Sequence, residues 1–411
     1  MNKIKIKSTL PPVVVTGLCT GALDIIRSLK NMGIEITAID TDLSQPSAHT
    51  KYATKIKCDD LVDDNKFISA LVNIAKQFKE KPVLFLTNDK YVLSVSRNRA
   101  LLSQHYMFNL PEEEVIETLT DKAKFSLFAQ EHNLPIPLTY IINNAEEASP
   151  IAAILQYPCV IKPIYKTSCW TSYYKANKAF KVYSEYELLK KVHETYLVMN
   201  IPVIIQEWIE GDESEIYFTL LYYDLEANLR SSFTGRKLLQ WLPEVGNTCI
   251  AESVNNEKIL EESRVLFDKI KFRGFASLEY KKDVITNTFK IIEPTVGRIN
   301  LQSSIAMGQN INMPLQYYCD LAKIEYPQCQ INKQQIFWIR EQSLVCLARE
   351  PKRLMKLPMK IWIKILLGKK VFTLFSFRDP LPFIYFLRET VVAVLKTLFY
   401  SKRHHLSTPV S

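Results

Sequence analysis

Two glutamates, Glu279 and Glu293, lie in consecutive strand-like segments, 275–282 and 289–295. Side chains alternate between the two faces of a strand, so a turn centred on Thr286 would place the two carboxylates across from each other on one face. Two like charges about 5 Å apart repel, and apolar neighbours strengthen that repulsion. A divalent cation would reverse its sign, and Mg²⁺ favours one or two carboxylates plus phosphate oxygens. The pair predicts a magnesium site, with two solvated glutamates on an exposed sheet face as the alternative.

Two lysines and an apolar strand are placed where they could hold a nucleotide. Lys162 ends a strand over 158–162, and Lys122 lies in the first turn of a helix. Either ammonium group could neutralise a phosphate, although a single lysine is more often a surface residue. A strand over 203–209 runs into a polar turn, and its backbone could hydrogen-bond an adenine edge, with an ordinary core strand as the alternative. The candidate adenine-binding residues are Gln206, Glu207, Trp208 and Ile209.

The elements that must position these residues follow two patterns. In the first 111 residues, strands alternate with helices, which predicts a parallel sheet covered on both faces. The strands are expected at 13–15, 34–39 and 83–87, and the helices at 22–32, 67–78 and 90–102. Later segments resemble antiparallel pairs mixed with helices, which is typical of an α+β arrangement. From about residue 330 the sequence predicts several short, basic, amphipathic helices.

The composition of the 411-residue chain narrows its class. Hydrophobic residues make up 47% and charged residues 23%, which excludes a disordered or fibrous protein. Residues 351–411 contain twelve basic and two acidic residues, so this segment carries +10 and the rest of the chain −1. Because the chain before residue 351 has almost no net charge, this distribution of charge counts against a protein whose main domains bind nucleic acid. The eight cysteines form no C-x-x-C motif, which favours reduced thiols and a cytoplasmic protein.

In their order along the chain, these segments resemble the ATP-grasp superfamily, in particular its carboxylate–amine ligase-like branch, over about residues 12–325. The matching segments are VVVTGLCTGALDIIRSLKNMGIEITAID, TDKAKFSLFAQEHNLPIP, PCVIKP, IIQEWIEGDE, GRKLLQWLPEVG and ASLEYKKD…FKIIEPTVGR. The resemblance implies ATP as cofactor with Mg²⁺, or with Mn²⁺ in its place. It also implies four units: a Rossmann-like domain over 1–111, a small ATP-grasp lobe over 112–202, a large lobe with the metal site over 203–328, and a basic helical tail over 329–411.

The resemblance also implies a role for each candidate residue. ATP would be bound by Lys122, Lys162, Gln206, Glu207, Trp208, Ile209 and the ribose-binding acid Glu213. The metal ligands would be Glu279, Glu293 and Thr295. Arg298 would stabilise the acyl phosphate and the intermediate that follows it, and Arg236 and Lys237 would lie near the phosphates or the substrate.

Two departures from the family pattern bear on activity. Thr295 stands where the family commonly has an asparagine, and a hydroxyl binds Mg²⁺ more weakly. The phosphate-covering loop over 164–174 contains no glycine, so its backbone can approach phosphates less freely. Closure of this loop would then depend on side chains such as Lys166, Thr167 and Ser168.

The function implied by the resemblance is ATP-dependent ligation of a small carboxylate to an amine, or to a thiol, through an acyl phosphate. A role in cell-wall or surface-polysaccharide metabolism is one setting for it. The first alternative is a catalytically idle ATP-binding scaffold. The second is a nicotinamide-dependent dehydrogenase, in which Asp40 would bind ribose, but G-x-x-x-G at 17–21 lacks the middle glycine of that motif.

The basic tail allows two interpretations, and the partners stay open. Residues 351–400 could make peripheral contact with the inner face of a membrane, or could form a helical layer packed on the catalytic body. We expect small carboxylate and amine substrates and no nucleic acid, with a homodimer left open.

Overall fold

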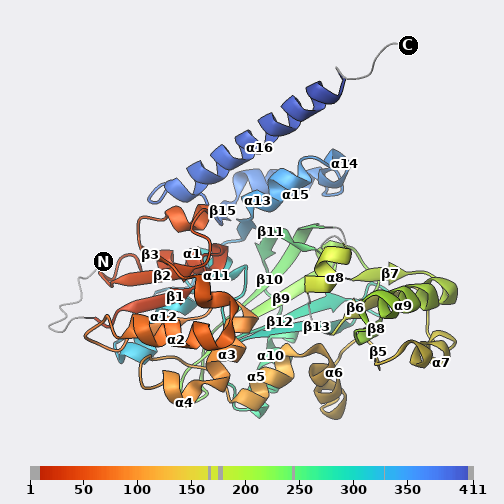
Figure 1. Cartoon of the computed structure of the whole chain (residues 1–411), viewed down its shortest axis with the longest axis horizontal. Coiled ribbons are helices and arrows are strands. Elements are labelled where there is room, and N and C mark those ends of the chain that lie inside the picture. Colours follow the sequence, from red (N-terminus) through yellow and green to blue (C-terminus); the bar gives the residue numbers. More distant parts are fainter. Residues whose placement is uncertain (1–9, 165–167, 175–178, 243–245, 328, 406–411) are drawn as a thin grey trace.

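The computed structural model describes residues 10–164, 168–174, 179–242, 246–327 and 329–405, which three β-sheets organise (Figure 1). The first sheet is parallel and has the strand order β3-β2-β1-β4. Its strands are β1 (Val13–Thr16), β2 (Ile36–Asp40), β3 (Thr54–Lys57) and β4 (Val83–Phe85). The alternation of strands and helices predicted this sheet. The strand β3 was not predicted, because this edge strand has no buried residue and therefore no apolar run.

Helices cover both faces of the parallel sheet. Val13 and Val15 point to one face and pack with α1 (Thr20–Leu29) and α12 (Met313–Ala322). Val14 points to the other face and packs with α2 (Asp64–Ala75) and α3 (Asp89–Arg97). Because α12 comes from a much later part of the chain, the first sheet and the following units share one core.

The second sheet has seven strands in the order β13-β12-β9-β10-β11-β14-β15. Phe218, Leu220 and Tyr222 on β9 face the core shared with the parallel sheet, whereas Leu221 and Tyr223 face α10 (Glu257–Lys269). This alternation buries both faces of the central strands. The strands are β9 (Ile216–Tyr223), β10 (Leu229–Trp241), β11 (Asn247–Ser253), β12 (Gly274–Lys282), β13 (Phe289–Val296), β14 (Ile336–Ile339) and β15 (Lys369–Phe372).

The third sheet is antiparallel and has the order β5-β8-β6-β7. Its strands are β5 (Thr139–Ile142), β6 (Cys159–Pro163), β7 (Phe180–Val182) and β8 (Val203–Glu207). One face packs on α7 (Ala148–Ala152), α8 (Ser168–Tyr173) and α9 (Glu185–Met199) through a separate apolar cluster. With the seven-stranded sheet, it forms the mixed α/β architecture expected of an ATP-grasp fold.

The C-terminal segment is not the purely helical tail that the sequence predicted. β14 and β15 extend the seven-stranded sheet at its edge beside β11. Both strands have only four residues, too short for a period-two pattern to distinguish them from helix. The unpaired backbone groups at the edge of β11 are satisfied by this pairing, so tertiary context overrides the local preference.

Two buried carboxylates anchor the C-terminal segment to the rest of the chain. Glu341 accepts hydrogen bonds from the backbone N–H groups of residues 373–375 and from the Thr373 hydroxyl. Asp379 accepts from Arg27 on α1, from the Thr50 hydroxyl and from the backbone N–H of residue 51. Packing on the body is therefore observed for this part of the segment.

The last helix, α16 (Leu381–His405), leaves the body after Phe386, and its side chains from 387 to 396 are mostly exposed (Figure 1). Within the described residues, no helix combines the length and apolarity needed to cross a bilayer. The remaining helices are α4 (Arg99–Leu102), α5 (Glu113–Thr120), α6 (Lys122–Glu131), α11 (Ser303–Gly308), α13 (Glu341–Leu347), α14 (Pro351–Leu354) and α15 (Met359–Leu367).

Candidate active site

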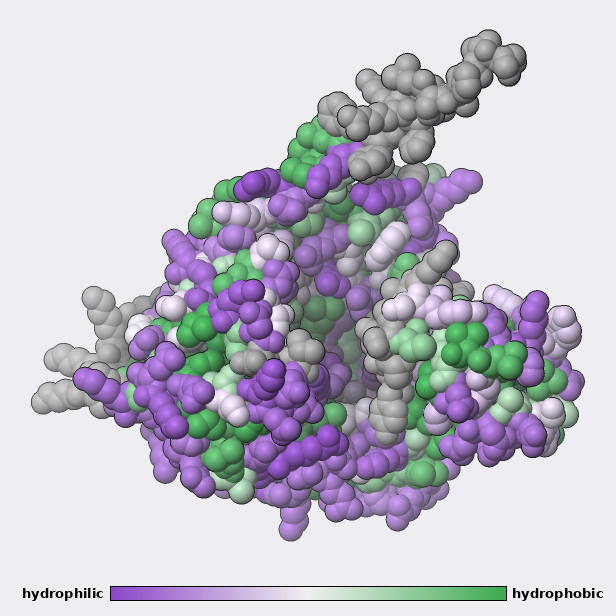
Figure 2. Space-filling view, in the orientation of Figure 1, coloured by the Kyte–Doolittle hydropathy of each residue, from purple (hydrophilic) through white to green (hydrophobic). Residues whose placement is uncertain are grey.

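A deep cleft lies between the four-stranded antiparallel sheet and the seven-stranded sheet, and Asp89 at the start of α3 contributes to its wall. Figure 2 shows the molecule hollowed near the middle of the face in view. Eleven of the thirteen sequence-predicted site residues line this cleft: Lys122, Lys162, Gln206, Glu207, Trp208, Ile209, Lys237, Glu279, Glu293, Thr295 and Arg298. They come from α6, β6, β8, β10, β12 and β13 and from the segments that follow β8 and β13.

Glu279 on β12 lies directly across from Glu293 on β13, as the sequence predicted. The predicted turn was symmetric about Thr286, but the observed strands pair with a different register near the turn. Tyr280 pairs with Ile291, so Ile292 is an extra residue in β13. This bulge shifts the register by one residue and brings the two carboxylates opposite each other beside the cleft.

The donor set around the two glutamates fits a magnesium ion bound together with a nucleotide. Glu279, Glu293 and the Thr295 hydroxyl are oxygen donors on the same strand pair and the same cleft. No group of three or more acidic, histidine or cysteine side chains in the described residues could hold a metal alone. Two carboxylates with open positions for phosphate oxygens are what Mg²⁺ commonly uses. Lys237 supplies a positive charge here, with its Nζ 2.6 Å from Glu279 Oε2.

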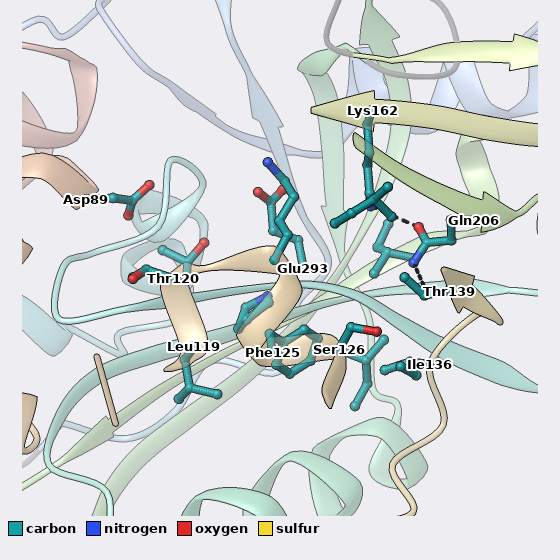
Figure 3. A pocket seen from close by; sticks show the side chains of 16 residues that line it. Asp89, Leu119, Thr120, Phe125, Ser126, Ile136, Thr139, Lys162, Gln206 and Glu293 are labelled. Carbon is teal, nitrogen blue, oxygen red and sulfur yellow. Dashed lines mark hydrogen bonds between the residues drawn. The ribbon is translucent and has the colours of Figure 1, made fainter. Parts of the chain in front are cut away.

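Lys122, Lys162 and Glu293 line the same part of the cleft, and Figure 3 shows Lys162 and Glu293 there. Lys162 Nζ donates a 2.9 Å hydrogen bond to Gln206 Oε1, and Gln206 Nε2 donates to Thr139 Oγ1 at 2.7 Å. Burial lowers the pKa of Lys162 to about 8, with a further lowering by the charge of Lys122 and an opposing effect of Glu293. A phosphate between the two lysines would relieve their mutual repulsion.

The candidate adenine-binding segment begins where β8 ends, at Glu207. Glu207 Oε2 accepts a hydrogen bond from the Leu138 N–H, so this carboxylate fixes the start of β5. Lys181 Nζ lies 3.9 Å from the centre of the Trp208 ring, and Ile209 is buried. The backbone of 208–209 has left the strand ladder at the cleft, where it could hydrogen-bond a planar base.

Arg298 joins the cleft to the parallel sheet domain. Its Nε lies 2.6 Å from Asp89 Oδ1, and its Nη2 donates to Asp89 Oδ2 at 3.2 Å. Burial alone would lower the pKa of Arg298, but Asp89 raises it above its ordinary value. A permanently charged, two-point-bound guanidinium is suited to stabilising negative charge at a fixed position.

Two predicted site residues, Arg236 and Glu213, do not line the cleft. Arg236 precedes Lys237 on β10, so it points to the opposite face, where it pairs with the buried Glu252. Glu213 pairs with Arg353 of α14 at 3.0 Å and accepts the Gln240 N–H at 2.7 Å. The predictions for Arg236 and for Glu213 as a ribose ligand therefore receive no support from the described arrangement.

Part of the phosphate-covering loop cannot be compared with its prediction, because Lys166 and Thr167 lie outside the described residues. Ser168 begins the short helix α8. Trp170 of the same helix is buried and lines the cleft, so an aromatic residue contributes to this wall where the family commonly has glycine-rich backbone.

Sequence reasoning missed Lys281, which lines the cleft two residues beyond Glu279 on β12. Its Nζ donates to the carbonyls of Gly211 and Asp212, at 2.6 and 2.5 Å, and burial lowers its pKa to about 8. These bonds tie β12 to the turn that follows the adenine-binding segment. The alternation that placed Glu279 toward the metal also predicts this position for Lys281.

The turn between β1 and α1 accounts for Asp40 without a nicotinamide cofactor. Asp40 is buried, and its carboxylate accepts hydrogen bonds from the Leu18 N–H and from Gln45 Nε2. Gly17 has φ +77°, and a Cβ there would lie 2.6 Å from Thr87 Oγ1. Asp40 therefore holds a tight glycine turn in place, which removes the main reason for the dehydrogenase interpretation.

Comparisons with known proteins bear on the class of the chain. No family model matches the chain. The chain is 24% identical over 311 residues to the D-aspartate ligase of Enterococcus faecium, covering 71% of this chain and 72% of that protein. The ADP complex of an N5-carboxyaminoimidazole ribonucleotide synthetase superimposes with a TM-score of 0.63 at 14% identity, covering 85% of this chain and 88% of the other.

A second solved structure contains the cofactor pair that the sequence predicts. It is the biotin carboxylase domain of the Hydrogenobacter thermophilus 2-oxoglutarate carboxylase, in complex with ADP and its magnesium salt. The TM-score is 0.61 at 16% identity, with 80% of this chain and 74% of that chain covered. The chain shares the mixed α/β fold of these structures, and its similarity to a ligase, a synthetase and a carboxylase domain bound to ADP and magnesium agrees with the predicted resemblance to ATP-grasp enzymes and with the predicted cofactors, ATP and Mg²⁺.

Proposed function

We propose that the chain joins a small amino-acid carboxylate to an amine through an acyl phosphate, at the cleft formed by β8, β12 and β13. The observation that carries this proposal is the opposition of Glu279 and Glu293 beside a cleft that also contains Lys122, Lys162 and Arg298. Two facing acids repel each other; Glu293 is exposed to the cleft, Glu279 is paired with Lys237, and nucleotide-bound magnesium has the chemistry to bind both carboxylates.

In the proposed reaction, a carboxylate oxygen of the substrate attacks the γ-phosphorus of ATP. The bond from that phosphorus to the ADP oxygen breaks, and an acyl phosphate forms. The amine nitrogen then attacks the carbonyl carbon, a C–N bond forms, inorganic phosphate leaves, and the amine loses a proton. Both transfers depend mainly on positioning and on neutralising charge.

The residues of the cleft divide this work by location. Lys122 and Lys162 would bind phosphate oxygens, and the backbone of 208–209 would bind the adenine. Arg298, held by Asp89, would stabilise the negative charge that develops on the acyl oxygen. Glu279, Glu293 and Thr295 would hold the magnesium that neutralises the β- and γ-phosphates. Lys237 would then exchange its contact with Glu279 for one with phosphate or substrate.

The substrate class follows from the cations around the acyl position. An amino dicarboxylate such as aspartate has a second carboxylate that Arg298 or Lys237 could bind, and similarity to a D-aspartate ligase supports this choice. A nucleophilic amine supplied by a cell-wall or surface-polysaccharide precursor would complete the reaction, and a thiol acceptor is the variant of the same chemistry.

An ADP-release screen over D- and L-amino acids, each with pooled amine acceptors, tests the proposal. We expect release that depends on one carboxylate and on Mg²⁺, highest with an acidic amino acid. The variant Glu293→Ala should lose this release while remaining folded by circular dichroism. Unchanged carboxylate-dependent release in Glu293→Ala would show that the metal assignment is wrong.

The catalytically idle scaffold is a second candidate, supported by Thr295 in place of the usual asparagine and by the glycine-free loop. It predicts tight binding of ATP·Mg²⁺ without turnover for every carboxylate tested. Isothermal titration with ATP·Mg²⁺ beside the same screen separates the two. Turnover with any carboxylate removes the scaffold interpretation.

A further inference from the structure

The segment from α14 through α15 exposes several large apolar side chains together with four lysines. We call this surface the α15 face. It lies with α13 and α16 on one side of the molecule (Figure 1). Leu366 is 72% exposed and Leu367 84% exposed, values more typical of charged residues. The face consists of Met355, Met359, Ile363, Leu366 and Leu367 together with Lys352, Lys356, Lys360 and Lys364.

The inner face of α15 is apolar as well, and it is already covered. Ile365 is buried, and Ile361 and Trp362 are half-buried against the cluster formed with Phe337 and Leu347. Successive residues of a helix are about 100° apart, so Ile363 and Leu367 point almost directly away from this cluster. A helix that is apolar on both sides requires a second covering surface, which the described residues do not provide.

Lys360 and Lys364 lie one turn apart on α15, so their side chains lie on the same side of that helix, whereas Lys352 lies on α14 and Lys356 in the turn between the two helices. The sequence has no aspartate or glutamate between Pro351 and Arg378. Other basic residues nearby are used within the chain, since Arg353 binds Glu213 and Lys370 donates to the carbonyls that end α15. The four lysines of the α15 face have no such partner among the described residues.

We propose that the α15 face docks on an anionic lipid surface. Its apolar side chains would enter the boundary between headgroups and acyl chains, and the lysine ammonium groups would reach anionic headgroups while their stems cover apolar surface. Four exposed lysines in a segment with no acidic residue between Pro351 and Arg378 are complementary to such a surface. A second copy of the chain fits less well, because it would bring the same four lysines toward the first. This proposal is independent of the ligase reaction.

The test uses the full chain and two kinds of vesicle, phosphatidylcholine alone and phosphatidylcholine with about one third phosphatidylglycerol. We expect flotation with the anionic vesicles, weak binding to the neutral ones, and release at about 1 M salt, where the screening length falls to about 3 Å. Leu366→Gln/Leu367→Gln and Lys360→Gln/Lys364→Gln should each weaken anionic-vesicle binding by about tenfold or more, without reducing ADP release in solution.

Matched controls come from equally exposed residues elsewhere in the chain. Leu197→Gln/Ile285→Gln removes two leucine-sized side chains of similar exposure, and Lys76→Gln/Lys79→Gln removes two exposed lysines; both should bind vesicles like the unchanged protein. Equal binding by all four variants would overturn the proposal, as would absence of flotation for the unchanged chain. A dimer in solution that Leu366→Gln/Leu367→Gln dissociates would assign the face to a second copy instead.

Discussion

Positive charge gathers both in the cleft and on the α15 face, and the two regions differ in how that charge is compensated. In the cleft, Lys162 donates to Gln206, Lys237 pairs with Glu279, and Lys281 donates to two backbone carbonyls. The lysines of the α15 face extend into solvent with no partner among the described residues. Partnered cations are fixed in place, as a reaction centre requires, and burial lowers the pKa of both Lys162 and Lys281, whereas solvated cations suit a partner that is itself an extended charged surface.

The largest effect is expected at the paired acids of the cleft. Glu293→Gln and Glu279→Gln should each lower kcat by roughly 10²–10³-fold, because each removes a charge that holds the metal on the transferring phosphate. The Mg²⁺ concentration for half-maximal rate should rise in both, which is measured by metal titration of ADP release. Glu261→Gln, on the exposed side of α10, is the control and should behave like the unchanged chain. A rate loss in the two variants without a change in metal dependence would contradict the assignment.

Glu279 and Glu293 show how much of the site could be predicted from the sequence. Alternation along the two strands was enough to place both side chains on one face and across from each other. The bulge at Ile292 was not predictable, because a two-versus-one pairing depends on how both strands pack and leaves no pattern in seven residues. Two predicted site residues do not line the cleft, for different reasons. Arg236 is next to Lys237, the residue of β10 that does line the cleft, and therefore points to the opposite face. Glu213 forms an ion pair with Arg353, which is 140 residues away in the chain.

The C-terminal segment was the least predictable part. Its four-residue strands are recognised by the sheet edge that they complete and not by their own sequence. Its anchors, Glu341 and Asp379, are single acids in a basic segment, and nothing local distinguishes them from surface residues. The parallel sheet was predicted more fully, since β1, β2 and β4 are buried and consist mostly of apolar residues.

The second prediction tests the contact that joins the two regions. Arg353 lies on α14 beside the α15 face and binds Glu213, and both side chains are almost buried. Arg353→Met would leave a mostly buried carboxylate without its cation, so the free energy of unfolding should fall by about 1–3 kcal/mol. Urea unfolding measures this change. A several-fold rise in KM for ATP should accompany it, because Glu213 also holds the Gln240 N–H at the cleft. Arg353→Lys should recover part of both effects, and an unchanged KM would mean that the two regions are independent.

The third prediction concerns pH. The pKa of Lys162 is lowered to about 8, so its ammonium group loses its proton as the pH rises through that value. KM for ATP should therefore rise by several-fold between about pH 7 and pH 9.5.

The same titration affects the stability of the fold. The unfolded chain keeps this proton up to the ordinary pKa of 10.5, so the free energy of unfolding should increase from about pH 8 to 10.5. Lys162→Arg, which stays charged, should show no rise in KM above pH 8. A rise of the same size in that variant would assign the pH effect to another group, such as Lys281.

The smallest effect is expected for the lysines of the α15 face. In the absence of lipid, Lys360→Gln/Lys364→Gln should leave kcat, KM for ATP and the urea midpoint unchanged, because these ammonium groups have no partner in the described structure to lose. Lys237→Gln, which also removes positive charge, should lower kcat/KM strongly, since it leaves the partly buried Glu279 without its 2.6 Å partner. Equal losses in the two variants would show that the lysines of the α15 face are part of the folded core or of the catalytic machinery. The distinction between compensated charge in the cleft and available charge on the tail would then be wrong.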